Sequence, residues 1–359
     1  MAHLLREDLK VAVVASVDLL RVAVEDQVVV AKTIWNQFDV LLADLDGVIY
    51  EGTQAIEGAV SAINDLQSQG IRVGYVTNNS SRKPETIIEQ LQGFGINSAP
   101  EDIISSGQTA VELLSTKIPA GAKVLVVGGD GLRARVTAGG FEIVSSSEDN
   151  PAAVIQGFAP DVSWRDLAEA SYSIQKGALW VATNNDWTLP QEKGVAPGNG
   201  TLVSAVHTAV GQLPLFAGKP EPAIFETALK VFNSTKALFV GDRLETDILG
   251  ANRAGIPSVL VLTGISSRKD VLAASLEERP TFIIDSLAEL STSYEEPEQT
   301  KRGWRCGKAS VELLGDKVLV TEGDPGSIEA LRAACKVIWN SGKHIHFLDV
   351  QSALYEKKA

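Results

Sequence analysis

The sequence predicts an α/β protein whose central element is a doubly wound parallel sheet. Short apolar runs alternate with helix-like segments from Phe38 onward, and the same alternation returns late in the chain. Between these two parts lies a long stretch that is rich in glycine and loops and has structural units of its own. We therefore expect a core interrupted by an inserted α/β domain and followed by a small α+β module.

The first half of the core contains strands that are predicted to be buried on both faces. Residues 40–43, Val-Leu-Leu-Ala, form an apolar run that ends in acid and glycine, as a central parallel strand often does. A helix is predicted over 57–69, because Ala59, Ile63 and Leu66 fall on one face and a glycine follows. The elements predicted next are a strand over 71–76, a helix over 84–92 that begins with proline, a strand at 103–104 and a helix over 108–116.

The remaining elements belong to the insertion, to the second half of the core and to the C-terminal part. In the insertion we predict separate structural units over 124–127, 153–156, 164–175 and 179–182. In the second half of the core we predict a strand over 237–240, a helix over 248–254 and a strand over 259–262. An acidic, polar stretch with a proline then indicates a linker.

These patterns divide the chain into five parts. They are an N-terminal extension (1–36), a core in two segments (37–118 and 213–290), an inserted domain (119–212), a linker (291–301) and a C-terminal module (302–359). The extension is helix-prone, and no function is predicted for it. The last part is too short to bury a large core alone.

The composition is that of an ordinary globular protein, with 45% apolar and 21% charged residues. The formal net charge is −13 and no run of Lys or Arg forms a basic stripe, so nucleic acid is not expected as a partner. No uncharged apolar stretch of about 18 residues predicts a membrane span, and the start of the chain does not resemble a secretory signal. Cys306 and Cys335 are too few for a disulfide framework and predict reduced core residues in a cytoplasmic protein.

Polar side chains of matching chemistry stand at the ends of several predicted strands. They are Asp44 and Asp46 after the first strand, Thr77 and Asn78 after the second, Asp242 after a late strand, and Lys219 in a Gly-Lys-Pro segment. One such Asp alone is more often a turn or helix cap, and one such Lys is usually a surface residue. Because the carboxyl ends of parallel strands open onto one crevice, the recurrence predicts a single site.

The residues around these strand ends resemble a known family. Asp44-Leu-Asp46-Gly47, Thr77-Asn78-Asn79, Gly218-Lys219-Pro220 and the stretch from Gly241 to Asp247 resemble the four motifs of the haloacid dehalogenase superfamily, in family order. Longer strings, among them LADLDGVIY, YVTNNSSR and GKPEPAIF, resemble its IIA subfamily of 4-nitrophenyl phosphatase- and phosphoglycolate phosphatase-like enzymes. The resemblance covers roughly Phe38 to Leu290, with a domain-sized insertion between the second and third motifs.

The resemblance implies a Rossmann-like core, an inserted cap domain and a magnesium-dependent phosphatase mechanism. Asp44 would attack phosphorus and form an aspartyl-phosphate, and Asp46 would protonate the leaving alkoxide and then deprotonate water. The implied Mg²⁺ ligands are Asp44, the Asp46 backbone carbonyl and Asp242, and Asp247 would bind through a water or orient Asp242. The residues implied to bind phosphate are Thr77, Asn78, Asn79 and Lys219. Independently of the family, converging carboxylates without a cation would repel one another.

Asp46 itself favours phosphate transfer, since dehalogenases of this superfamily lack the second Asp. The cap candidates for substrate specificity are Asn184, Asp186, Trp187 and Asn199, each with a turn or packing role as the alternative. The chain departs from its relatives at Asn185, where proline is common, so the shape of this cap loop is not predicted.

The C-terminal module resembles the partial acetyltransferase-like tail of actinobacterial members that look like glycerol 3-phosphate phosphatases. It has no visible acyl-CoA pyrophosphate loop, so we expect a structural or interaction role. The predicted activity is hydrolysis of a small metabolite phosphate, with glycerol 3-phosphate as the best candidate. The alternatives are 2-phosphoglycolate, pyridoxal phosphate, a nucleoside monophosphate, or a non-catalytic phosphate-binding scaffold. The sequence leaves a homodimer open.

Overall fold

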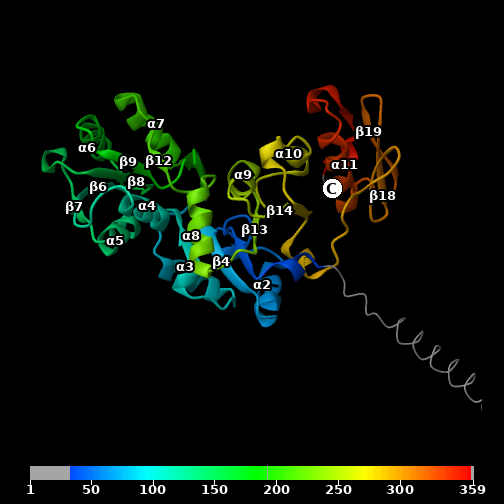
Figure 1. The fold of residues 1–359 in the computed structure, drawn as a ribbon, viewed down its shortest axis with the longest axis horizontal. Coiled ribbons are helices and arrows are strands. Elements are labelled where there is room, and N and C mark those ends of the chain that lie inside the picture. The colour runs from blue at the N-terminus through cyan, green and yellow to red at the C-terminus, as the bar shows by residue number, and fades with distance from the viewer. Residues whose placement is uncertain (1–32, 192, 357–359) are drawn as a thin grey trace, which may run out of the picture.

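The computed structural model describes residues 33–191 and 193–356. The prediction of an N-terminal extension falls almost entirely on residues outside these ranges. The described chain builds three sheets of five or six strands, together with two small two-stranded sheets. The first sheet lies in the middle of an elongated molecule, and the other two large sheets lie at opposite ends of it (Figure 1).

The core sheet has six parallel strands in the order β15-β14-β13-β1-β4-β5. Their bounds are β1 Val40–Ala43, β4 Arg72–Thr77, β5 Ile103–Ser105, β13 Ala237–Gly241, β14 Ser258–Val261 and β15 Phe282–Ile284. The chain runs outward from β1 in one direction through β4 and β5, and in the other direction through β13 to β15. The strand order therefore reverses between β1 and β13, the position where open α/β sheets bind ligands.

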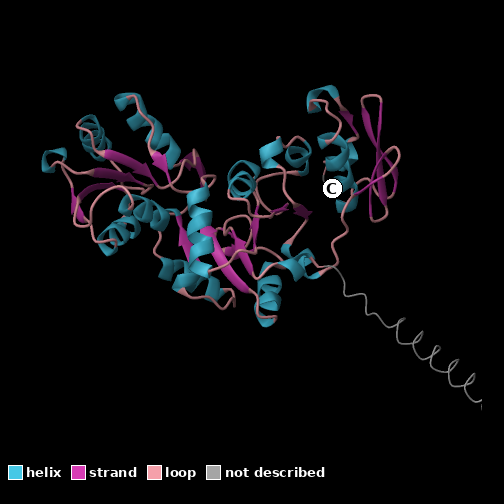
Figure 2. Cartoon of the chain, in the orientation of Figure 1, coloured by secondary structure: helices cyan, strands magenta, loops and turns pink. Residues whose placement is uncertain are grey.

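Helices cover both faces of the core sheet, which confirms the doubly wound prediction (Figure 2). Leu41 of β1 packs with α2 Ala59–Ser68 and α3 Pro84–Gly93, whereas its neighbour Leu42 packs with α8 Pro222–Phe232. Successive side chains of a strand point to opposite faces, so an all-apolar strand needs a partner layer on each side. On the α8 face, α9 (Leu249–Arg253) adds Ala251 to the layer.

The second sheet is also parallel and belongs to a unit that we call the cap. Its order is β12-β9-β8-β6-β7, with bounds β6 Lys123–Val127, β7 Glu142–Val144, β8 Ala153–Gln156, β9 Leu179–Ala182 and β12 Leu215–Phe216. Its helices are α4 Ser106–Ser115, α5 Asp130–Ala138, α6 Trp164–Gln175 and α7 Asn199–Val210. An antiparallel hairpin, β10 Thr188–Gln191 with β11 Gly194–Pro197, precedes α7.

The cap has its own apolar layers. Val124 of β6 packs toward α4 and α5, and Leu125 packs toward α6 and α7. The cap is longer than the predicted insertion, residues 119–212. Helix α4 ends before residue 119 and strand β12 begins after residue 212, and both belong to the cap. The predicted division into domains itself stays a prediction.

The third sheet, the C-terminal module, has the order β16-β17-β18-β19-β20 and packs on one helix. The bounds are β16 Glu298–Gln299, β17 Gly303–Cys306, β18 Ala309–Leu314, β19 Lys317–Glu322, α11 Ile328–Trp339 and β20 Asp349–Val350. Helix α11 lies between this sheet and α10 Arg268–Leu272 of the core (Figure 1). Apolar side chains of the core, among them Leu272 and Ile283, form one cluster with Val311 and Leu331 of the module.

Two further predictions concern single features. Cys306 and Cys335 are both buried and free, as predicted, and burial raises the pKa of the Cys306 thiol to about 11. No helix of the described chain is long and apolar enough to cross a bilayer.

Candidate active site

The predicted site residues of the core meet where β1 and β13 end. Asp44 directly follows β1, Asp242 directly follows β13, and Thr77 is the last residue of β4. The backbone N–H of Asp44 donates to the carbonyl of Val240, 2.9 Å away, which fixes the two strand ends against each other. Strands in parallel register therefore bring together residues that lie about 200 positions apart in sequence.

Asp44 has one oxygen engaged and one free. Its Oδ1 accepts the backbone N–H of Leu45 and the ammonium of Lys219, each at 2.8 Å. No hydrogen bond or ion pair joins Oδ2 to another described residue. The carboxylate is thus held in one orientation, with Oδ2 available for chemistry.

Lys219 is 3% exposed and lies between two carboxylates. Its Nζ is 2.8 Å from Asp44 Oδ1 and 2.7 Å from Asp247 Oδ1, and it also donates to the carbonyl of Val76 at 3.4 Å. Burial alone would lower the pKa of Lys219, but the charges of Asp247 and Asp44 raise it above its ordinary value. The ammonium is therefore a fixed positive charge inside the site.

Asp242 and Asp247 complete an acidic group with Asp44. One carboxylate oxygen from each of the three lies within 4.8 Å of the others. Burial, and next the charge of Asp247, raise the pKa of Asp242 to about 7. Burial likewise raises the pKa of Asp44, although Lys219 opposes this. The three acids are electrostatically unfavourable as they stand, and one lysine does not neutralise them.

A divalent cation fits this group. Asp242 Oδ2 accepts the backbone N–H of Ile265 at 2.7 Å, but its Oδ1 is buried and has no hydrogen-bond partner. A buried, unpartnered carboxylate oxygen costs free energy unless a donor or a metal ion satisfies it. Hard oxygen ligands of this kind suit Mg²⁺.

The segment that carries Asp247 is a π-helical turn, Leu244–Ile248, where the sequence analysis predicted a helix only from 248. Asp247 Oδ2 accepts the backbone N–H groups of Asp242 and Arg243, at 3.1 and 3.0 Å. The side chain thus caps its own turn and leaves Oδ1 facing Lys219. Single π-helical turns occur frequently at functional sites.

Two glycines are required by close approach to Asp242. A Cβ on Gly264 would lie 2.0 Å from Asp242 Oδ2. Gly47 has a φ of +81°, and its Cβ would lie 2.5 Å from the same oxygen. Any side chain at either position would displace the carboxylate.

The loop after β4 uses most of its polar side chains on itself. Thr77 Oγ1 accepts the backbone N–H of Asn79 at 3.0 Å. Asn79 Oδ1 in turn accepts the N–H groups of Ser81 and Arg82, at 3.0 and 3.1 Å. These bonds shape the loop, and the predicted role of Thr77 and Asn79 in binding phosphate stays a prediction.

Asn78 connects the loop to Lys219 and to the cap. Its Oδ1 accepts the Lys219 backbone N–H at 2.8 Å, and its Nδ2 donates to the Lys219 carbonyl and to Asp186 Oδ1, both at 3.1 Å. The backbone carbonyl of Asn78 accepts Ser106 Oγ at 2.6 Å and Asn184 Nδ2 at 2.7 Å. The side-chain amide of Asn78 is therefore occupied in this arrangement, and the predicted role of Asn78 in binding phosphate stays a prediction.

The four cap candidates divide into three roles. Asn184 and Asn199 are buried: Asn199 Nδ2 donates to the Asn184 carbonyl at 2.8 Å, so both hold the cap loop. Trp187 is 59% exposed, and its backbone carbonyl accepts hydrogen bonds from Gly198 N–H at 2.8 Å and Thr201 Oγ1 at 2.7 Å. Asp186 faces the core site through Asn78. Burial raises the pKa of Asp186, while the Asn78 hydrogen bond and the charge of Lys219 oppose the shift.

Asp46 lies apart from the acidic group and reaches solvent at the mouth of the site. Protein atoms surround it closely enough to raise its pKa by desolvation, while Lys219, Arg82 and Arg243 act in the opposite direction. The two arginines were not predicted as site residues. Arg243 directly follows Asp242, and Arg82 is the last residue of YVTNNSSR. Their positions inside these motifs could have indicated that they belong to the site.

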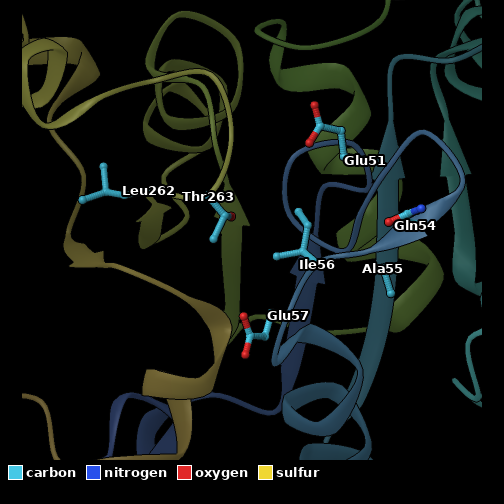
Figure 3. A pocket seen from close by; sticks show the side chains of 7 residues that line it. All are labelled: Glu51, Gln54, Ala55, Ile56, Glu57, Leu262 and Thr263. Atoms are coloured by element: carbon cyan, nitrogen blue, oxygen red, sulfur yellow. The ribbon is translucent and has the colours of Figure 1, made fainter. Parts of the chain in front are cut away.

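A surface pocket of about 550 Å³ lies between residues 51–57 and residues 262–263. Figure 3 shows Glu51 and Glu57 toward opposite ends of it, with Thr263 on one wall. Thr263 Oγ1 donates to the Gly47 carbonyl at 2.7 Å, so the pocket shares this wall with the acidic site. Its lining holds two carboxylates and no cationic side chain, which makes it unsuitable for a phosphate group.

This fold and this site define a class of protein. The haloacid dehalogenase-like hydrolase family matches residues 41–142, and a HAD-hydrolase-like family matches residues 216–290. The chain belongs to the haloacid dehalogenase-like hydrolases, and within them it is a phosphatase.

Particular relatives can be named. The chain is similar to D-glycerol 3-phosphate phosphatase of Mycobacterium tuberculosis, with 44% identity over 72% of each chain. It is also similar to an acid sugar phosphatase of Staphylococcus aureus, with 36% identity over 71% of this chain and 97% of the relative.

Solved structures agree with these matches. A glycerol phosphate phosphatase from M. tuberculosis in complex with magnesium matches with a TM-score of 0.81 and 38% identity, over 89% of this chain and 95% of that one. A thermostable NPPase from Geobacillus stearothermophilus matches with a TM-score of 0.65 and 33% identity, over 70% and 97%. The first match covers more of this chain than the second. The resemblance of the C-terminal module to an acetyltransferase-like tail stays a prediction.

Proposed function

We propose that the protein is a Mg²⁺-dependent phosphomonoesterase that hydrolyses glycerol 3-phosphate to glycerol and phosphate. One observation carries the proposal: three carboxylates meet around a buried lysine, and the Asp242 Oδ1 atom among them is buried without a partner. The similarity to a glycerol 3-phosphate phosphatase and to a magnesium complex of such an enzyme supports both the metal and the substrate.

The chain's own groups support a two-step displacement. Asp44 attacks phosphorus through Oδ2, the bond from phosphorus to the alkoxide oxygen breaks, and Asp46 gives its proton to that alkoxide. Asp46 then takes a proton from water, whose oxygen attacks phosphorus and releases Asp44 as a free carboxylate. Two donors on Asp44 Oδ1 keep Oδ2 aimed in one direction, which reduces the entropic cost of the attack.

Electrostatic stabilisation accounts for most of the required rate. General acid assistance contributes roughly 10²–10⁴-fold, far less than the acceleration that phosphate monoester hydrolysis needs. Mg²⁺ held by Asp44, Asp242 and Asp247 would supply positive charge against the phosphoryl group. Lys219 adds a positive charge on the protein side, and Thr77 and the loop after it are proposed to bind the phosphoryl oxygens.

The nucleophile assignment is tested with the full chain in Mg²⁺. Asp44→Asn should reduce phosphate release by at least about a thousandfold, because a carboxamide cannot form the covalent intermediate. Asp65→Asn, the same change on an exposed helical residue, should leave turnover unaltered. Near wild-type turnover in Asp44→Asn would exclude Asp44 as the nucleophile.

The substrate is tested with a panel of phosphate esters ranked by kcat/KM. Glycerol 3-phosphate should rank above 2-phosphoglycolate, pyridoxal phosphate and nucleoside monophosphates. A lower rank would remove it as the proposed substrate while leaving the phosphatase mechanism intact.

The remaining proposals concern the setting of the enzyme. We propose that the cap, which contains the predicted insertion 119–212, excludes water from the site on closure. A cytoplasmic location and a lack of nucleic acid partners agree with the acidic net charge of −13. Light scattering on the purified chain tests whether it forms a homodimer.

A further inference from the structure

One short segment connects Asp242 of the acidic site to the C-terminal module. This segment is the loop 264–267, which lies between β14 and α10. The backbone N–H of Ile265 donates to Asp242 Oδ2 at 2.7 Å, and that of Ser266 donates to the Asp242 carbonyl at 3.0 Å. The loop therefore fixes both the carboxylate and the backbone of Asp242.

The same loop also holds the turn that carries Asp247. Ser266 Oγ accepts the backbone N–H of Leu244, the first residue of the π-helical turn, at 3.0 Å, and Ser266 is buried. Leu244 and Ile248 of that turn pack in the apolar cluster that also contains Leu331 of module helix α11. The loop thus supports the segments that carry two of the three carboxylates.

Arg268, the first residue of α10, joins the end of this loop to the module. Its Nη1 donates to the carbonyl of Gly326, just before α11 begins, at 2.8 Å. Its Nη2 lies 2.8 and 3.0 Å from the two carboxylate oxygens of Asp285, which directly follows core strand β15. A guanidinium carries its donors in a fixed fork, so one arginine can hold a partner on each side of the boundary between core and module.

The connection from Arg268 back to the acidic site is short and stiff. Arg268 lies three positions after Ile265. Ser267 lies between them and caps α10, since its backbone N–H and its Oγ donate to Asp270 Oδ2 at 2.8 and 2.6 Å. Such a cap fixes the direction in which the chain enters a helix, so a shift of α10 moves the Ile265 N–H with it. A shift of a few tenths of an ångström is enough to weaken a hydrogen bond.

The module also packs on the rest of α10. Trp339 Nε1 of α11 donates to the carbonyl of Val271 at 3.2 Å. Val271 and Leu272 belong to the same apolar cluster as Leu331, and α10 lies beside α11 (Figure 1). Separation of the module from the core would therefore release α10 and the loop before it.

From these contacts we infer that Arg268 is a positioning residue of the metal site. It holds α10 against the module, and this fixes the Asp242 carboxylate through the Ile265 N–H. Docking of the module and binding of Mg²⁺ therefore favour each other. The inference rests on the Mg²⁺ site of the proposed function and goes beyond it, because it gives the C-terminal module a part in metal binding.

The first measurement is a Mg²⁺ titration of turnover by the full chain, with 4-nitrophenyl phosphate so that the result does not depend on the proposed substrate. In Arg268→Ala the Mg²⁺ concentration for half-maximal activity should rise by about tenfold, while kcat at saturating Mg²⁺ stays within about twofold of the wild type. A mere loss of folded protein would instead lower kcat and leave the half-maximal concentration unchanged. The matched control is Arg305→Ala, which removes an exposed ion pair of the module and should change neither value.

The second measurement does not need turnover. Cys335 is fully buried on the face of α11 that carries Arg332 and Trp339, both of which donate to core carbonyls. Its thiol should react with a water-soluble disulfide reagent when α11 separates from the core, and peptide mass spectrometry identifies the labelled cysteine. Since coupling acts in both directions, saturating Mg²⁺ should slow this reaction by about tenfold in the wild type and by less than about twofold in Arg268→Ala.

The results that would overturn the inference are distinct from those that would overturn the proposed function. If Arg268→Ala keeps the half-maximal Mg²⁺ concentration within about twofold, Arg268 does not position the metal site, while the proposed function stands. The same conclusion follows if Mg²⁺ leaves the labelling of Cys335 unchanged in the wild type, or slows it equally in Arg268→Ala. If turnover of the wild type needs no Mg²⁺, the proposed function fails and this inference fails with it.

Discussion

Arg332 of the C-terminal module should be worth several kcal/mol to the stability of the whole chain. It is 5% exposed on α11, and its Nε donates to the carbonyl of Ile283, on edge strand β15 of the core, at 2.8 Å. Its Nη2 is 2.9 Å from Glu289 Oε2, and its guanidinium lies 4.0 Å from the centre of the Tyr294 ring. One side chain therefore joins the module to the core through two contacts and to the linker through a third.

The magnitude for Arg332→Ala follows from these contacts. Removing one partner of a buried ion pair costs about 3–5 kcal/mol, and a buried carbonyl left without a donor costs about 1–3 kcal/mol. Glu289 is 27% exposed and regains water in the variant, which reduces the first figure, and such costs do not add. We expect a loss of about 3 kcal/mol in the free energy of unfolding.

Urea denaturation followed by tryptophan fluorescence measures this loss. With a slope of about 3 kcal/mol per molar, the midpoint should fall by about 1 M. The control is Arg305→Ala in the same module, whose ion pair with Glu322 is exposed on both sides and contributes at most about 1 kcal/mol. Equal midpoints for the two variants would refute the reasoning that Arg332 docks the module.

Two further predictions concern the acidic site. Gly264→Ala places a Cβ about 2.0 Å from Asp242 Oδ2, so the Mg²⁺ concentration for half-maximal activity should rise by roughly tenfold or more, as a metal titration of turnover would show. Mg²⁺ should stabilise the wild type against heat by about 2.7 kcal/mol at a hundred times its Kd, because it relieves the repulsion among the carboxylates. Asp242→Asn should abolish this thermal shift and stabilise the metal-free protein, since one of the repelling charges is gone.

The Gly264→Ala and Asp242→Asn predictions each have a control. Gly93→Ala adds a Cβ at the exposed end of α3, where no atom lies within 4 Å, and should leave the metal titration unchanged. An identical rise in both glycine variants would argue against the close approach as the cause. A full Mg²⁺-induced shift in Asp242→Asn would place the metal elsewhere.

The strand pattern predicted the core and most of the site. An all-apolar strand such as β1 requires a layer on each face, and this local requirement already implies a doubly wound sheet. The carboxyl ends of parallel strands share one edge, so Asp44, Thr77 and Asp242 could be placed together without knowing any distance between them. The motif spacing also predicted a domain-sized insertion between the second and third motifs.

Other parts of the site could not be predicted in this way. Asn78 was predicted to bind phosphate, and this role stays a prediction; what the sequence did not predict is that its side-chain amide bonds to Lys219 and Asp186. Asn78 and Asp186 are 108 residues apart, in loops that carry no periodic pattern. Their contact depends on how the cap packs on the core, and no local sequence signal encodes that angle.

The sequence by itself therefore determined the fold class, the family and the positions of the acidic residues, because each of these follows from local periodicity and from short motifs. Only the tertiary structure decided which oxygen atoms are satisfied and which are free. Asp242 Oδ1 remains buried without a partner, and Arg332 finds its partners on the core. The physical reason is that a hydrogen bond depends on distances of a few tenths of an ångström, which packing between distant segments sets.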